Sequence, residues 1–361
     1  GTMRQDVELL AAITFDVAVI DESHHIKNPS AQITRAAAQL VASTRIALSG
    51  TPVMNGTADL YAQMEFLLPG LLGTREFFKR EYAIPIEQQG DKEKAAALQK
   101  IINPFVLRRT KQQAAPELPA KTETVLWCNM GHNQREAYNT IKDNVKSSVL
   151  LDIEKNGLNK GKMSVLAGLT KLRQTCNSPE LVKSEDLFCY DSVKTERLLE
   201  ELKNLVPHHK TLVFSQFTGM LDLLGQALTK AKLPFLRLDG QTPAHQRQQL
   251  VNEFQSPQSQ THVFLISLKA GNAGLNLTAA EYVFLVDPWW NAAVENQAID
   301  RTHRIGQQAH VFAYRLICKD SVEEKIIHLA SKKKVLAEDL VTADESFVKS
   351  LTEADIAYLL Q

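Results

Sequence analysis

The chain has 361 residues, of which 44% are hydrophobic, and its 41 basic and 41 acidic side chains give a formal net charge of zero. This length is enough for two globular lobes, and no stretch reaches the ~18 unbroken apolar residues of a membrane helix, which excludes a membrane-spanning protein. The zero net charge excludes a uniformly basic protein, so any contact with a polyanion must use a local basic surface.

Two short apolar runs near the start of the chain predict parallel strands. Phe15–Ile20 ends at the acid pair Asp21–Glu22, and Arg45–Leu48 ends at Ser49–Pro52, "SGTP". Both patterns are typical of strands buried on both faces, with polar groups at their carboxyl ends. Pro29–Ala42 has the composition and length of a helix, so we expect a βαβ unit.

Helical patterns follow from Asp59 to about Leu107. The two prolines of Pro116–Lys121 discourage helix on both sides and predict a connection between lobes. An extended run then leads into further helices, which reach Asn177. Within them we expect Gly157–Met163, "GLNKGKM", to form a mobile loop between helices.

Five apolar strand candidates recur in the last part of the chain: Thr211–Gln216, Phe235–Gly240, His262–Ser267, Tyr282–Asp287 and His310–Ile317. Helical stretches lie between most of them, such as Val193–Leu205 with a cap at Asp191 or Ser192. This alternation predicts an α/β domain with a doubly wound parallel sheet, which binds ligands beyond the carboxyl ends of its strands.

The acid pair at the first strand's end suits a nucleotide triphosphatase. Asp21 can hold the magnesium shell while Glu22 orients the attacking water. Taken alone, the pair is more typical of solvated turn acids. The catalytic interpretation is favoured because "SGTP" follows the next strand and arginines follow late in the chain, so that the three motifs form an ordered set.

The late segment Val294–Gln307, "VENQAIDRTHRIGQ", carries Arg301 and Arg304. On a helix, residues three apart point the same way, as two charges aimed at one phosphate cluster must. Gln297 lies one turn earlier on that face. We therefore expect the two arginines to act as fingers that stabilise the departing γ-phosphoryl group.

The loop Ser267–Ala280, "SLKAGNAGLNLTAA", contains two glycines. Glycines let the backbone approach a phosphate closely, while Lys269 and Thr278 can add a charge and a hydroxyl. A glycine-containing loop is often a plain turn, but its position after a strand favours phosphate binding.

Together these motifs resemble the Swi/Snf-type branch of the superfamily 2 helicase-like ATPases, which includes DNA translocases and chromatin remodellers. "DESH" resembles motif II of this family, "SGTP" motif III, "TLVFSQF" motif IV, "SLKAGNAGLNLTAA" motif V and "DPWWNAAVENQAIDRTHRIGQ" motif VI with its lead-in. "PFVLRRTK", "ELPAKTE" and "KLRQTCNSPEL" resemble stretches typical of this branch. The resemblance runs from about Thr14 to Ala330, and the style of several motifs is closer to bacterial members.

The resemblance implies two RecA-like lobes with helical insertions, with ATP and Mg²⁺ in the cleft and double-stranded DNA across both lobes. By position, Asp21 and Glu22 serve magnesium and water, and Arg301 and Arg304 are the catalytic fingers. The nucleotide side also includes His24, Gly274, Asn276 and Gln297. Coupling of hydrolysis to DNA contact falls to Ser49 and Thr51, with His24, and the candidate DNA-backbone contacts are Ser215, Gln216, Lys269 and Thr278.

The resemblance also implies a division of the chain. We expect a truncated first lobe in residues 1–118, a connection and helical insertion in 119–190, the second lobe in 191–330 and a helical tail in 331–361. A phosphate-binding G-x-x-x-x-G-K-[ST] loop is expected well before motif II, and the 361 residues contain none. We therefore expect a carboxyl-terminal piece of a longer ATPase that is inactive by itself.

Other functions remain open at this point. The chain could be a catalytically silent scaffold that binds DNA or protein, or a strand-separating helicase of the same superfamily. A metal enzyme is less favoured, because His24 and His25 lack partners at ligand spacing. The expected partners are double-stranded DNA and a protein client on DNA, with no membrane.

The four cysteines are too far apart for a CxxC pair: Cys128, Cys176, Cys189 and Cys318. We expect them to be buried small hydrophobic residues in a reducing compartment. That compartment is the cytoplasm, in association with the nucleoid, if the source is bacterial, and the nucleus if it is eukaryotic.

Overall fold

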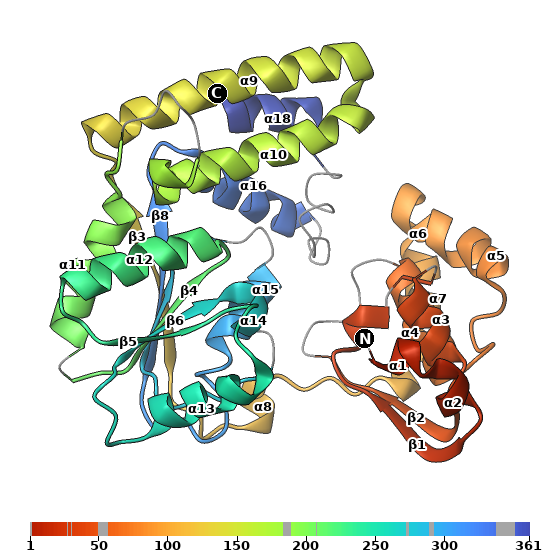
Figure 1. Cartoon of the computed structure of the whole chain (residues 1–361). Coiled ribbons are helices and arrows are strands. Elements are labelled where there is room, and N and C mark those ends of the chain that lie inside the picture. The colour runs from red at the N-terminus through yellow and green to blue at the C-terminus, as the bar shows by residue number, and fades with distance from the viewer. Residues whose placement is uncertain are drawn as a thin grey trace. The chain divides into compact units, whose positions relative to one another are not determined.

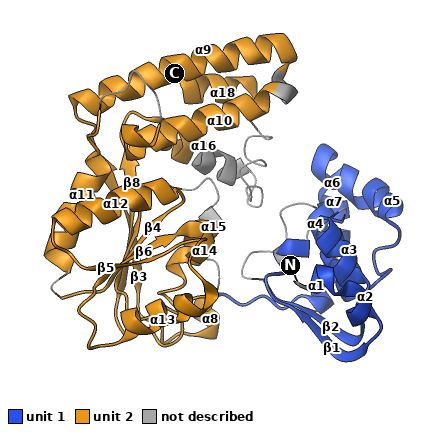
Figure 2. Ribbon diagram, in the orientation of Figure 1, with its two compact units in different colours: residues 1–110, 336–340 blue, residues 111–335, 341–361 orange. Residues whose placement is uncertain are grey.

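The computed structural model divides the chain into two compact units, which Figures 1 and 2 show. The first unit is built mainly from residues up to Thr110, and the second from most residues from Lys111 onward. The structure describes residues 2–26, 28–29, 31–49, 57–182, 189–206, 208–271, 274–288, 292–336 and 351–361. No helix among these residues has both the length and the apolar character needed to span a bilayer.

The first unit contains the expected βαβ arrangement. Strands β1 (Thr14–Ile20) and β2 (Val41–Ala47) are parallel, and helix α3 (Gln32–Ala38) connects them. Two short helices, α1 (Thr2–Gln5) and α2 (Val7–Ala11), precede β1.

The expectation that both strands are buried is wrong for the described residues. Val17 and Val19 of β1 are 51% and 54% exposed, and Ile46 of β2 is 41% exposed. A parallel strand is buried on both faces only when helices cover both sides of its sheet. The described sheet of this unit has two strands and leaves much of its apolar surface open.

The rest of the first unit is helical, as expected. Its elements are α4 (Thr57–Leu67), α5 (Arg75–Phe78), the π-helical turn η2 (Lys79–Ala83), α6 (Ile84–Gln89), α7 (Lys92–Ile102) and the 3₁₀ turn η3 (Asn103–Phe105). Leu60, Met64, Phe78 and Leu98 lie in a small core between these helices. The Asp91 carboxylate accepts hydrogen bonds from the first free N–H groups of α7, which sets where this helix begins.

The boundary between the units falls at Thr110 and Lys111, ahead of the prolines that the sequence indicates. Residues 103–110 are exposed. Helix α8 (Lys111–Ala114) already belongs to the second unit, where Lys111 forms an ion pair with Asp300 over 2.6 Å.

The second unit contains a six-stranded sheet in which every pairing is parallel, in the order β3-β8-β7-β4-β6-β5. All five predicted strands are present: β4 (Thr211–Ser215), β5 (Phe235–Leu238), β6 (Val263–Ser267), β7 (Tyr282–Leu285) and β8 (Val311–Cys318). The extended run after the prolines is β3 (Lys121–Cys128), the edge strand beside β8.

Helices cover both faces of this sheet, so that alternate strand residues enter two separate cores. On β4, Val213 joins the core that includes α11 (Val193–Leu205) and α12 (Thr218–Lys230). Leu212 and Phe214 join the core that includes α13 (Ala244–Gln255) and α15 (Ala292–Ile299). A short helix, α14 (Leu268–Gly271), follows β6 directly.

Two long helices form an antiparallel pair above the first of these cores (Figure 1). These are α9 (His132–Asn156) and α10 (Leu158–Asn177). The expectation of a loop over Gly157–Met163 is wrong, because Gly157 alone separates the two helices. Its φ of 76° and ψ of 162° belong to a region that is accessible essentially to glycine only.

The remaining elements complete the second unit. The 3₁₀ turn η4 (Pro179–Leu181) follows α10, helix α16 (Val322–Leu336) follows β8, and α18 (Glu353–Leu360) packs against α9. Helix α11 begins as expected, since the Ser192 hydroxyl accepts a hydrogen bond from the Thr195 N–H.

Candidate functional site

The two acids lie directly after the end of β1. Asp21 is exposed, and its Oδ1 accepts a hydrogen bond from the Glu22 N–H over 2.8 Å. Glu22 has a φ of 51°, which is unusual for a residue other than glycine. Strained backbone of this kind clusters at functional sites, because only the surrounding structure keeps it in place. The exposed oxygens of Asp21 are of the type that Mg²⁺ prefers.

Backbone hydrogen bonds join the ends of β1 and β2. The Leu48 N–H donates to the Ile20 carbonyl, and the Ser23 N–H donates to the Leu48 carbonyl, each over 2.8 Å. These bonds place the acid pair and Ser49 at the same edge of the sheet, and Ser49 is exposed there. Thr51 and the His24 side chain lie outside the described residues, although the His24 backbone is part of the 3₁₀ turn η1 (Ser23–Ile26).

The two candidate finger arginines do not share a helix, which corrects the sequence prediction. Helix α15 ends at Ile299, and both Arg301 and Arg304 lie in the turns that follow, while half-buried Gln297 is still helical. Backbone bonds from Thr302 and His303 to the Ile299 carbonyl close the first of these turns. Arg301 and Arg304, three positions apart, therefore lie in one compact turn and not on one face of a helix.

The arginine turn is attached to the glycine-containing segment. The Leu277 N–H donates to the Arg301 carbonyl over 3.0 Å, and Arg304 Nη1 reaches the Leu275 carbonyl at 3.5 Å. Gln307 Nε2 donates to the Ala280 carbonyl over 2.9 Å. The structure thus brings the arginines together with the segment that the sequence places near phosphate.

Within that segment the candidate residues differ in exposure. Gly274 (φ 71°) and Asn276 are exposed, as is Lys269 on α14. Thr278 is half-buried, and its hydroxyl accepts a hydrogen bond from Gln255 Nε2 over 3.2 Å. Gly274 and Asn276 are therefore accessible to a ligand, while Thr278 is already engaged within the domain.

Ser215 and Gln216 at the end of β4 are both bound to Asp287, the second residue after β7. Ser215 Oγ donates to Asp287 Oδ1 over 2.5 Å, and the Gln216 N–H donates to Oδ2 over 2.9 Å. Ser215 and Asp287 are fully buried. Burial raises the pKa of Asp287 to about 6, although the Ser215 hydroxyl and the charges of Arg173 and Lys194 favour its ionised form.

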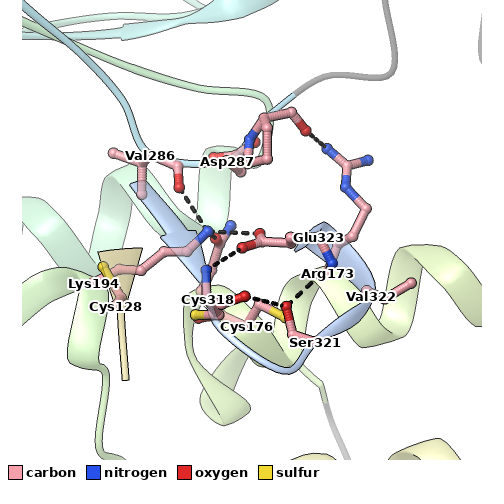
Figure 3. Close-up of polar contacts among 12 residues, drawn as sticks. Cys128, Arg173, Cys176, Lys194, Val286, Asp287, Cys318, Ser321, Val322 and Glu323 are labelled. Atoms are coloured by element: carbon pink, nitrogen blue, oxygen red, sulfur yellow. Dashed lines mark hydrogen bonds and ion pairs between the residues drawn. The ribbon is translucent and has the colours of Figure 1, made fainter. Parts of the chain in front are cut away.

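The structure adds residues that the sequence did not single out, above all Lys194 and Glu323 (Figure 3). Lys194 is completely buried in the first turn of α11, and its ammonium lies 2.6 Å from Glu323 Oε1 in the first turn of α16. Burial alone would lower the pKa of Lys194, but the Glu323 carboxylate raises it above its ordinary value. A lysine in the first turn of a helix is unfavourable, because the positive end of the helix dipole repels it. This unusual position was the one feature of the sequence that could have marked Lys194 as a residue with a special role.

The ligand atoms of Cys176, Cys318 and Glu323 lie within 4.8 Å of one another, close enough to raise the question of a metal site. Both Glu323 oxygens are already used, by Lys194 and by the Cys318 N–H. A hydrogen bond involving Cys176, together with burial, raises the pKa of the Cys318 thiol well above its ordinary value, so it stays protonated. The Lys194 ammonium already supplies the positive charge, and a divalent cation does not fit here.

The expected burial is confirmed for three of the four cysteines. Cys128, Cys176 and Cys318 are buried and form no disulfide, whereas Cys189 is only half-buried. Burial raises the pKa of the Cys128 thiol to about 12, which makes it a poor nucleophile.

Comparison with known proteins identifies the family to which this chain belongs. Residues 1–181 match the SNF2-related domain family, and residues 193–306 match the helicase conserved C-terminal domain. The chain therefore belongs to the SWI2/SNF2 family of helicase-like proteins, as the motifs indicate.

Among solved structures, the chain is similar to the Sulfolobus solfataricus SWI2/SNF2 ATPase core in complex with double-stranded DNA. The two are 33% identical with a TM-score of 0.57, and the match covers 99% of this chain and 75% of that one. The fold is accordingly that of the SNF2 ATPase core, an α/β fold with two RecA-like lobes.

Curated relatives come from different kinds of organism. An uncharacterised ATP-dependent helicase of Mycoplasma genitalium is 34% identical over the whole of this chain, which covers 34% of that protein. The TATA-binding protein-associated factor MOT1 of Saccharomyces cerevisiae is 31% identical over 96% of this chain and 22% of its own length. The chain thus spans about a third or less of these relatives, and they do not confirm a bacterial origin.

Proposed function

We propose that the protein containing this chain is an ATP-dependent double-stranded DNA translocase that couples hydrolysis to movement along the duplex. The observation that carries the proposal is the acid pair Asp21–Glu22 at the carboxyl end of a parallel strand, with strained backbone at Glu22. Membership in the SWI2/SNF2 family supports it, as does the similarity to a family core whose structure is a complex with DNA.

The proposed roles in hydrolysis follow from the charges of the acid and arginine side chains. Asp21 would hold Mg²⁺, which neutralises phosphate charge when it is bound. Glu22 would orient the attacking water and draw its proton, while Arg301 and Arg304 would stabilise the charge that develops as the γ-phosphoryl group leaves. Gln297, Gly274, Asn276 and His24 would complete the nucleotide side.

We assign the DNA contacts to the carboxyl edge of the second sheet. Exposed Lys269 would meet a phosphate directly, and Gln216, the first residue after β4, would add a second contact. Because the hydroxyls of Ser215 and Thr278 are engaged within the domain, these two residues would support the contact surface from inside. Ser49 and Thr51 would couple the nucleotide to this surface. Backbone contacts of this kind make affinity fall steeply with salt and depend little on sequence.

The decisive experiment is ATP turnover with and without duplex DNA. It requires the protein that carries these residues together with a phosphate-binding loop, because the 361-residue chain, which lacks one, should turn over ATP negligibly. We expect turnover to rise with duplex and to fall at least ~100-fold in Glu22→Gln, which keeps the side-chain shape but removes the charge. Asp16→Asn, an exposed acid on the same strand, is the matched control and should be near wild type.

The alternatives predict other outcomes. Nucleotide binding without turnover in the folded wild-type protein would favour a scaffold that binds DNA or a protein client. Strand displacement on a forked substrate would indicate a strand-separating helicase. Duplex-stimulated turnover without displacement is the outcome that the translocase proposal requires, in the cytoplasm of a bacterium or in a nucleus.

A further inference from the structure

The two carbonyl groups on either side of Asp287 are each held by a cation from a different helix. Lys194 on α11 donates to the Val286 carbonyl over 2.7 Å, and Arg173 on α10 donates to the Pro288 carbonyl. Figure 3 shows both contacts. The turn that presents the Asp287 carboxylate to the end of β4 is thus held by a hydrogen bond on each side of Asp287.

Lys194 is fixed by two further partners. Its ammonium donates to Asn177 Oδ1 over 2.9 Å and to Glu323 Oε1 over 2.6 Å, so all three of its protons are used. Glu323 Oε2 in turn accepts the Cys318 N–H at the end of β8. Lys194, Asn177, Glu323 and Arg173, which we call the Lys194 cluster, therefore tie α10, α11 and α16 to the ends of two neighbouring strands.

Such a cluster is a costly way to stabilise a fold. Lys194 and Glu323 are fully buried, and Arg173 is 2% exposed. Removing two charges from water carries a desolvation penalty, and buried ion pairs can often be replaced by apolar side chains without loss of stability. What an apolar side chain cannot do is donate a hydrogen bond to a chosen carbonyl, and this is the feature that Lys194 and Arg173 share.

We propose that Lys194, Glu323 and Arg173 are positioning residues for DNA binding. They hold the 286–288 turn so that Asp287 fixes the Ser215 hydroxyl and the Gln216 N–H at the end of β4, where we place the DNA contact. This inference rests on the proposed function, because it assumes that the end of β4 faces DNA. It assigns the three residues no contact with nucleotide or DNA.

The test is the double substitution Lys194→Met/Glu323→Gln. It removes both charges together, shortens the lysine side chain by one atom only, and keeps an acceptor for the Cys318 N–H, so the domain should fold. We expect the duplex concentration for half-maximal ATPase stimulation to rise at least ~10-fold, while turnover at saturating duplex stays within about twofold of wild type. Arg173→Met, on another helix, should shift the same quantity and serves as the second variant.

Lys203→Met is the matched control, because Lys203 is an exposed lysine on the same helix, and it should leave both quantities unchanged. Stable, folded Lys194→Met/Glu323→Gln and Arg173→Met proteins with wild-type half-saturation would overturn the inference. Such a result would mean that the cluster serves stability alone.

A second measurement does not depend on DNA. Hydrogen exchange of the Gln216 amide, which donates to Asp287, should be slow in the wild-type protein and at least ~10-fold faster in the double variant. If wild-type turnover does not respond to duplex, the translocase proposal fails, and the exchange rate still decides whether the cluster positions this strand end. Unchanged Gln216 exchange would contradict positioning directly.

Discussion

Asp287 is the residue on which the polar contacts at the carboxyl edge of the second sheet converge. Its folded pKa of about 6 lies above the ordinary unfolded value of about 3.9. Because the folded protein binds the proton more tightly, Asp287 favours folding most at low pH. This contribution is full below about pH 4 and is lost as the pH rises to about 6.

The prediction at this scale concerns the variant Asp287→Asn, which cannot titrate. The free energy of unfolding of the wild-type chain, minus that of the variant, should fall by on the order of 2 kcal/mol between pH 4 and pH 6. Urea denaturation at several pH values measures it, and carboxyl groups common to both proteins cancel in the difference. A difference that is flat or rises with pH would show that Asp287 is not a buried, protonated acid at low pH.

At the scale of elements, the α9–α10 pair depends on one residue. Gly157 ends one helix and begins the next, with a backbone conformation that a Cβ atom disfavours. No neighbouring atom lies within 4 Å of a Cβ built there, so a substitution tests the backbone alone. Gly157→Ala should therefore destabilise the chain by ~1–3 kcal/mol.

The control for this substitution is Gly131→Ala at the start of α9. Gly131 also has open space around it, but its φ of −64° suits any residue. Alanine there should change the free energy of unfolding by less than ~1 kcal/mol. Thermal or urea denaturation compares the two, and equal effects would mean that the turn at position 157 carries no strain.

At the scale of the whole molecule, the two units differ in how much apolar surface they bury. Strands β4 and β6 are buried along their whole length, whereas β1 and β2 alternate between exposed and half-buried positions. Local stability follows the number of buried apolar contacts. Amides of β1 and β2 should therefore exchange with solvent at a lower opening free energy than those of β4 and β6. Equal protection in hydrogen-exchange mass spectrometry would contradict this prediction.

The sequence predicted those elements whose structure depends on residues close to one another in the chain. All five strands of the last lobe and the Ser192 cap of α11 were predicted, because β-branched runs and capping residues act within a few positions. The Gly157 turn was missed, because a glycine-rich stretch fits a loop and a helix start equally well. The helix assumed for Arg301 and Arg304 was wrong, because the turn is fixed by hydrogen bonds to a segment more than twenty residues away.

The sequence by itself determined the family and the parallel α/β architecture of the second unit, since these follow from ordered motifs and from hydrophobic periodicity. It also singled out the acids and arginines as candidate site residues. Only the tertiary structure decided that Ser215 faces Asp287 and that Lys194 is buried against Glu323. The physical reason is distance along the chain. Lys194 and Glu323 are 129 positions apart, and no local pattern reveals which lysine will find a buried carboxylate.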